Sequence, residues 1–167
     1  MVTVVFESPL GLVRVSGDEK GVAVISCTDS SVQEITPEIQ SISPLVEPVQ
    51  AAVQQLKDYF AGSRQTFDFP LNPSGTTFQQ TVWQALLDVP FGTTQSYLAL
   101  SRRIGDEKAI RAVAAANGRN PLWIVVPCHR IIGSDGSLTG YAGGLWRKQW
   151  LLEHEGAFAK SSQLSLF

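Results

Sequence analysis

Three short runs near the start of the chain have the composition of β-strands. Residues 2–6 (VTVVF), 11–17 (GLVRVSG) and 21–27 (GVAVISC) are rich in valine and isoleucine, which favour extended structure. The sequences between them, SPLG and GDEKG, consist of residue types that form turns. Because such short connections join neighbouring antiparallel strands, the pattern predicts an antiparallel meander.

A helix is predicted after residues 28–47, which mix Ser, Thr, Pro and Glu with isolated apolar residues and are interpreted as a loop. Apolar residues then recur at 49, 52, 53, 56, 59 and 60, which is helical spacing. Pro48 stands near the predicted start of this helix and Gly62 at its end. Residues 66–71 (TFDFPL) are predicted to form a short strand.

The chain becomes mostly helical after residues 72–77 (NPSGTT), which we interpret as a linker. Residues 78–89 form a predicted helix, one face of which carries Phe78, Val82, Ala85 and Leu86.

Two further short helices are predicted over residues 96–105 (SYLALSRRIG) and 106–118 (DEKAIRAVAAANG). Gly105 closes the first, Asp106 is the predicted N-cap of the second, and Gly118 lies past its end. Two short helices joined by a tight glycine turn, with basic residues on the second, fit a helix-turn-helix. Many helical hairpins bind nothing, so this pattern alone leaves a non-binding hairpin open.

The predicted fold class is α/β with two domains. Residues 1–73 would form a small antiparallel sheet with a helix. Residues 76–158 would form a mainly helical domain that contains the helix-turn-helix, a buried strand at 121–126 (PLWIVV) and an amphipathic helix within 143–156. Residues 159–167 are interpreted as a tail.

Composition excludes several classes of protein. The 167 residues are 44% hydrophobic and 17% charged, as in a packed globular chain. No apolar run approaches the roughly 20 residues that cross a bilayer, and no basic leader precedes the first strand, so we expect a cytoplasmic protein. The two cysteines, Cys27 and Cys128, and the two histidines show no CxxC or HExxH spacing, so no metal site is expected.

The charge is distributed unevenly along the chain, although its net value is only −2. Residues 1–75 carry nine acidic and four basic residues, whereas residues 76–156 carry eight basic and six acidic residues. Five of these bases lie between positions 102 and 119, a local stripe of the kind that attracts a polyanion. On charge alone, a solvated helix surface is the favoured interpretation.

Cys128 lies in the stretch IVVPCHRII, between two apolar runs. Most buried cysteines act as small hydrophobic residues, and Cys27 at a strand end is interpreted that way. Cys128 differs because His129, an imidazole that can accept a proton, follows it directly. Glu155, at the end of the last helix, is a candidate to orient His129, although a solvated helix end explains its position equally well. His154 is a competing base.

The sequence around Cys128 resembles the O6-alkylguanine-DNA alkyltransferases. Their motif is Pro-Cys-His-Arg followed by two apolar residues, and this chain has PCHRII. GRNP precedes the motif and GSDGSLTGYAGGLWRKQWLLEHEG follows it, in the family's order and spacing. The resemblance covers about residues 76–156. The N-terminal half is similar, more weakly, to the family's ribonuclease-H-like domain.

The resemblance implies DNA repair in which an alkyl group moves irreversibly from O6-alkylguanine to Cys128, once per molecule. His129 would act as base through a bridging water, with Glu155 orienting it. Tyr97 would give a proton to guanine N3, and Arg111 would enter the duplex in place of the flipped nucleotide.

Further positions follow from the same resemblance. Asn120 would brace the turn between the recognition helix and the active-site strand. The substrate pocket would be lined by Tyr141, Ala142, Gly143, Pro127, Trp123 and Ile131. DNA would also be contacted by Arg102, Arg103, Lys108, Ala112, Ala115 and Gly118. The implied partner is double-stranded DNA with alkylated guanine, bound through the minor groove. The resemblance also implies a monomer that needs no cofactor and does not bind a membrane. O4-alkylthymine stays open as a second substrate.

Three other functions compete with DNA repair. A non-catalytic binder of damaged DNA shares this domain but replaces the cysteine, and the presence of Cys128 argues against it. A cysteine hydrolase with a Cys–His–Glu site would turn over repeatedly on an ester or amide. A redox protein would pair Cys128 with Cys27, but their spacing does not support this.

Overall fold

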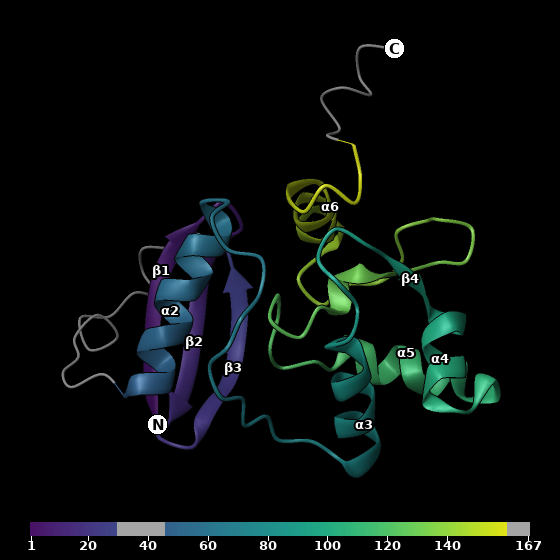
Figure 1. Cartoon of the computed structure of the whole chain (residues 1–167), viewed down its shortest axis with the longest axis horizontal. Coiled ribbons are helices and arrows are strands. Elements are labelled where there is room, and N and C mark those ends of the chain that lie inside the picture. Colours follow the sequence, from purple (N-terminus) through teal and green to yellow (C-terminus); the bar gives the residue numbers. More distant parts are fainter. Residues whose placement is uncertain (30–45, 160–167) are drawn as a thin grey trace. The chain divides into compact units, whose positions relative to one another are not determined.

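The computed structural model describes residues 1–29 and 46–159 (Figure 1). The chain divides into two compact units, of which the first joins residues 1–74 with 121–123 and the second joins residues 75–120 with those from 124 onward. Most of the predicted loop at 28–47 and of the predicted tail at 159–167 lies outside the described residues.

The first unit is built on a three-stranded sheet. Strands β1 (Val2–Ser8), β2 (Gly11–Asp18) and β3 (Gly21–Thr28) pair in sequence order, each antiparallel to the next. The predicted meander is therefore confirmed. A change of register between Ser16 and Gly17 shows that β2 carries a bulge against β3.

Helix α2 (Glu47–Phe60) covers this sheet and confirms the predicted helix (Figure 1). Its apolar stripe is buried, and the fully buried members are Val49, Ala52, Leu56 and Tyr59. The strand predicted at 66–71 is wrong, since only Leu71 forms a single bridge, to Val22. Pro70 has no N–H to donate to a ladder, which limits the pairing to this one point.

The second unit begins with helix α3 (Thr77–Leu86), which starts at a capping box between Thr76 and Gln79. Its buried residues are Val82, Trp83 and Leu86. Phe78 does not belong to the buried face, because 37% of it is exposed in the first turn. Trp83, which the predicted face omitted, is buried and donates from Nε1 to the carbonyl of Ala116 at 2.9 Å.

Helices α4 (Tyr97–Ile104) and α5 (Ile110–Gly118) form the predicted pair of short helices. Gly105 ends α4 with φ of 106°, a left-handed conformation that glycine adopts at low cost. The second helix differs from its prediction in two ways. A 3₁₀ turn, η2 (Glu107–Ala109), precedes it, and this turn is what Asp106 caps. Gly118 is its last residue and not the residue beyond it.

The strand predicted at 121–126 is wrong. The main chain of Ile25 bonds to Pro121 and Trp123, which gives one isolated bridge between Ile25 and Leu122. Ile124 then takes a φ of 75°, which ends the extended conformation. Buried β-branched residues alone did not guarantee a pairing partner, because tertiary contacts decide strand formation.

The remaining elements of the second unit are short, apart from one helix. Strand β4 (Gln95–Ser96) pairs parallel with β5 (Ile131–Ile132), and η3 (Cys128–Arg130) is a single 3₁₀ turn just before β5. Helix α6 (Leu145–His154) confirms the last predicted helix. Within the described ranges, every helix is too short or too polar to cross a membrane.

Candidate active site

Cys128 is placed by a tight turn of the main chain. Its N–H donates to the carbonyl of Val126 at 2.8 Å, around Pro127 with φ of −82° and ψ of 62°, the geometry of an inverse γ-turn. Asn120 Nδ2 donates to the same carbonyl at 2.8 Å and so links the end of α5 to this turn. Two hydrogen bonds to the Val126 carbonyl therefore fix the backbone that carries the Cys128 sulfur.

The thiol of Cys128 is buried, with only 4% of the residue exposed. Burial raises its pKa from 9.0 to about 11, while a hydrogen bond from Asn120 and the charge of Lys148 act in the opposite direction. Cys128 is therefore protonated at neutral pH, and a base must remove its proton before it can react as a thiolate.

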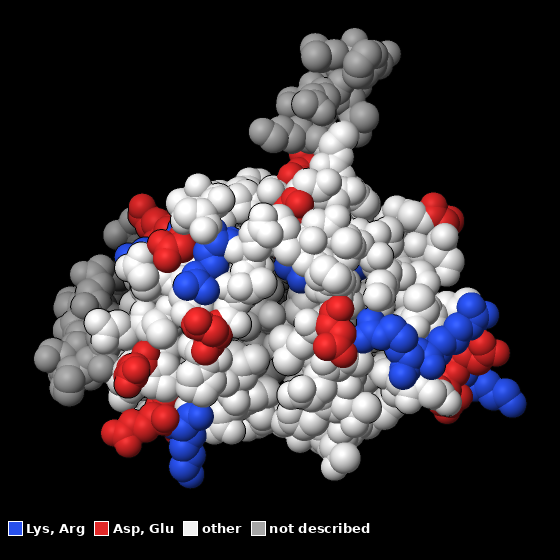
Figure 2. All heavy atoms as spheres, in the orientation of Figure 1, with Lys and Arg blue, Asp and Glu red and all other residues white. Residues whose placement is uncertain are grey.

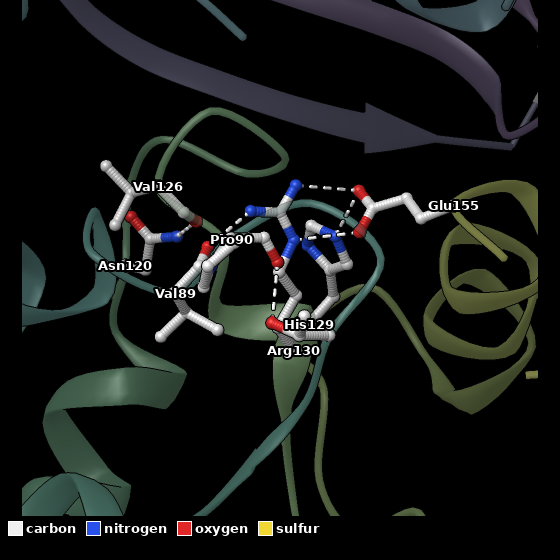
Figure 3. A network of polar contacts seen from close by, with 8 residues as sticks. Val89, Pro90, Asn120, Val126, His129, Arg130 and Glu155 are labelled. Carbon is white, nitrogen blue, oxygen red and sulfur yellow. Dashed lines mark hydrogen bonds and ion pairs between the residues drawn. The ribbon is translucent and has the colours of Figure 1, made fainter. Parts of the chain in front are cut away.

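His129 and Arg130 share the carboxylate of Glu155 (Figure 3). The Nε2 of His129 lies 2.8 Å from Glu155 Oε2, while Arg130 donates to both carboxylate oxygens at 2.8 and 3.0 Å. The third guanidinium nitrogen of Arg130 donates to the carbonyl of Val89 at 2.7 Å. All three side chains are buried, so this charged cluster is closed off from water.

The protonation states in this cluster follow from burial and charge. Burial favours the neutral form of Glu155, but His129 and Arg130 outweigh it and hold the pKa of the carboxyl well below its usual range. Burial lowers the pKa of His129 despite the opposing charge of Glu155. Glu155 is thus ionised and His129 neutral at pH 7. The ring proton sits on Nε2, where it donates to Glu155, and Nδ1 is left as a proton acceptor.

Three buried cations in this region, Arg130, Arg147 and Lys148, were missed by sequence reasoning. Arg130 is counted only as a charge in the sequence analysis, although its place between the apolar runs of IVVPCHRII is a signal of burial. Lys148 is fully buried and donates from Nζ to the carbonyls of Ile131, Thr139 and Gly140 at 2.6, 2.9 and 3.2 Å. Burial lowers the pKa of Lys148 to about 8.

A signal for Lys148 was present in the sequence. It lies three and four residues before Leu151 and Leu152 and seven before Glu155, so it occupies the buried stripe of α6. A cation on an apolar stripe must be paired or hydrogen-bonded, which marks it as a residue with a specific role.

A cavity of about 470 Å³ opens between α4, α5 and the segment before α6. The described residues that line it are Tyr97, Ile110, Arg111, Ala114, Thr139 and Gly140. Its size is in the range of small-molecule sites. Tyr97 and Arg111, two of the predicted site residues, thus face one cavity. The Tyr97 hydroxyl donates to the carbonyl of Thr139 at 3.0 Å, and Lys148 Nζ lies 5.9 Å from the ring centroid of Tyr97.

The predicted pocket residues are not among those six. Pro127 and Ile131 are buried beside Cys128, while Tyr141, Ala142 and Gly143 form the turn that precedes α6, in which Gly144 N–H donates to the Tyr141 carbonyl at 2.9 Å. Trp123 belongs to the first unit, where its N–H donates to the Ile25 carbonyl at 3.0 Å.

All seven residues predicted to contact DNA are exposed on the helix pair: Arg102, Arg103, Lys108, Arg111, Ala112, Ala115 and Gly118. Figure 2 shows basic side chains gathered over this part of the second unit. Two of them are partly neutralised, because Arg102 pairs with Glu107 at 2.9 Å and Arg103 lies 3.7 Å from Asp88.

Comparison with known protein families gives a match for each half of the chain. Residues 77–157 match the family model described as 6-O-methylguanine DNA methyltransferase, DNA binding domain, and residues 1–73 match its ribonuclease-like domain. The chain belongs to the 6-O-methylguanine DNA methyltransferase family. These matches also confirm the resemblance stated from the PCHRII motif.

Individual relatives in the methyltransferase family agree over nearly the whole chain. A methylated-DNA–protein-cysteine methyltransferase of Methanosarcina acetivorans is 44% identical over 92% of this chain and 97% of its own. Its Mycobacterium tuberculosis counterpart is 44% identical over 96% and 95%.

Solved structures confirm the predicted α/β fold class. The crystal structure of M. tuberculosis O6-methylguanine methyltransferase has a TM-score of 0.78 at 40% identity and covers 99% of both chains. A structure of the M. tuberculosis protein in complex with DNA has a TM-score of 0.80 at 38% identity and covers 100% of both chains.

Proposed function

We propose that this protein repairs O6-alkylguanine in DNA by transferring the alkyl group to Cys128 Sγ. One observation carries the assignment of the acceptor. Of the two cysteines, Cys128 alone is followed by a histidine held by a buried carboxylate, whereas Cys27 lies in strand β3 of the other unit. The relatives are named protein-cysteine methyltransferases, so a single activated cysteine is the feature their chemistry requires.

The proposed reaction begins with neutral His129. Its Nδ1 takes the proton of the Cys128 thiol through a bridging water, and Glu155 stabilises the imidazolium that forms. The thiolate attacks the alkyl carbon in line, the new S–C bond forms, and the C–O6 bond breaks with its electron pair on O6. Guanine gains one proton, at N3 from Tyr97, and the Tyr97 phenolate regains a proton as the His129 imidazolium gives one up, so the proton lost by sulfur ends on guanine. The thioether is inert, so each molecule acts once.

The substrate base must leave the duplex to reach the sulfur, which costs a few kcal/mol of unstacking. The cavity beside Tyr97 is the proposed receiver of the flipped base, and Arg111 on its rim would fill the space left in the stack. The turn at Tyr141–Gly143 would cover the base, with main-chain N–H groups available to O6. Asn120 would hold the turn before Cys128 in register with α5.

The proposed DNA interface is the exposed face of α5, entering the minor groove as a monomer. Ala112, Ala115 and Gly118 keep that face small, so the helix backbone can approach the sugars closely. Arg102, Arg103 and Lys108 flank it and would meet phosphates, so binding should weaken as salt rises.

Replacing Arg111 with alanine tests the interface. We expect a loss of a few kcal/mol at most in duplex binding but a larger fall in transfer from duplex than from the free base O6-benzylguanine, because Arg111 is proposed to stabilise the flipped state. Arg64→Ala, a change in the other unit, is the matched control and should leave both rates unchanged. Equal losses with both substrates in the Arg111 variant would contradict the assignment.

The function itself is tested with a duplex that carries one O6-methylguanine opposite cytosine. Restoration of guanine, detected by cleavage with a restriction enzyme that methylation blocks, is the expected result. A methylated duplex that stays unchanged in the presence of excess folded protein would overturn the proposal.

A further inference from the structure

Two hydrogen-bond acceptors are buried at the active site without a protein donor. Asn117, on the last turn of α5, is 5% exposed, and His129 is fully buried. Among the described residues, Asn117 Oδ1 and His129 Nδ1 have no hydrogen-bond partner. Buried polar atoms are nearly always bonded to protein or to ordered water, so these two require a donor.

The orientation of the Asn117 amide is fixed by its other end. Its Nδ2 lies 3.4 Å from the carbonyl oxygen of Cys128 and donates to it. The reverse orientation would bring two oxygens together, because a main-chain carbonyl only accepts. Oδ1 is therefore the free end, and it belongs to a side chain that already contacts the reactive cysteine.

The acceptor character of His129 Nδ1 is equally well defined, because Nε2 carries the ring proton toward Glu155 at 2.8 Å. A single water molecule has two hydrogens, one for each of these acceptors. Such a water would have its oxygen lone pairs directed away from both of them, where they can accept the S–H of Cys128.

We propose that Asn117 is a positioning residue that holds this water by accepting one of its hydrogens. The inference rests on the proposed function and deepens it, since the water is the one that carries the thiol proton. With one hydrogen fixed on Asn117, the other must point at His129 Nδ1, so the water is oriented for transfer in one direction. The thiol proton passes to the water oxygen while the water's second hydrogen passes to Nδ1, which leaves thiolate and imidazolium.

Asn117→Leu tests this role, since leucine has a similar size but no acceptor. We expect the rate of alkyl transfer at pH 7 to fall about 10- to 100-fold, as for partial loss of general-base catalysis. The deficit should shrink as pH rises toward the pKa of Cys128, about 11, because the thiolate then forms without the relay. The charged groups that act on His129, which are Glu155, Arg130 and Lys148, are unchanged in this variant.

One control variant separates a proton relay from simple packing. Gln55→Leu removes another largely buried amide, in helix α2 of the other unit, and should leave the pH profile of transfer unchanged. A rate in Asn117→Leu that falls by the same factor at every pH, or does not fall, would contradict the proposal.

A crystal structure of the wild-type protein, at a resolution that shows ordered water, decides the matter even if the variant does not fold. Water within about 3.2 Å of both Asn117 Oδ1 and His129 Nδ1 is the expected result. A protein donor at either atom, or water on only one of them, would overturn the proposal. Wild-type transfer to Cys128 is measured alongside, so that failure of the proposed function is seen separately.

Discussion

Replacing Cys128 with serine is expected to abolish alkyl transfer while binding of a methylated duplex stays close to that of the wild type. The hydroxyl is a far weaker nucleophile than a thiolate, and His129 cannot deprotonate it to a useful extent. Serine is slightly smaller than cysteine, and the site already contains the polar groups of Asn120 and Lys148, so the fold should accept the change.

The measurement is a single-turnover repair assay together with duplex binding by fluorescence anisotropy. Cys27→Ala is the matched control, because it removes the second cysteine from strand β3 and should leave transfer intact. Transfer activity that survives in Cys128→Ser, or that disappears in a folded Cys27→Ala protein, would show that the acceptor has been assigned to the wrong residue.

Replacing Glu155 with glutamine is expected to destabilise the protein strongly at neutral pH. Glu155 is the acid that pairs with Arg130, with both side chains buried, and removal of one partner from such a pair typically costs about 3–5 kcal/mol. The free energy of unfolding, measured by urea titration, should fall by this amount. Alkyl transfer by the remaining folded protein should also be slower, because His129 loses the group that stabilises its charged form.

The pH dependence distinguishes this loss from a general packing defect. The pKa of Glu155 is lowered in the folded protein, so its contribution to stability is complete above its unfolded value of about 4.5 and is lost as pH falls below it. The stability difference between wild type and Glu155→Gln should therefore be constant near pH 6–7 and shrink on acidification below about 4.5.

Glu107→Gln provides the comparison for an exposed pair. Glu107 pairs with Arg102 at 2.9 Å, but both side chains are more than half exposed, and such pairs contribute about 0–1 kcal/mol. An equal effect of the two glutamine substitutions would contradict the account of the buried cluster.

The sequence predicted the local elements of the fold better than their pairing. The meander and helix α2 follow from periodicity and turn residues, which act over a few positions. The strand expected at 121–126 fails because Ile124, with φ of 75°, turns the chain away after the single bridge between Ile25 and Leu122. No pattern of apolar residues encodes this change of direction. Spacing alone places Phe78 on a buried face, whereas 37% of this residue is exposed in the first turn of α3.

In the candidate site, too, contacts between neighbours in the sequence could be predicted, whereas contacts made only by folding could not. His129 was tied to Cys128 by the covalent chain, so its position needed no fold. The sequence leaves open whether Glu155 is a solvated helix end or a partner of His129. The structure decides for the partner, because a 2.8 Å contact joins the two side chains, which are 26 residues apart in the chain. Arg130 and Asn117 gained their roles only from packing, because burial, not residue type, makes their polar atoms important.

The most direct test of the account is the stoichiometry of repair by the wild-type protein. With methylated duplex in excess, we predict that guanine is restored in an amount equal to the amount of active protein, and that peptide mass analysis finds one added methyl group on Cys128. Continued turnover beyond one equivalent, or a methyl group on any other residue, would contradict the proposal that this buried sulfur is the final acceptor.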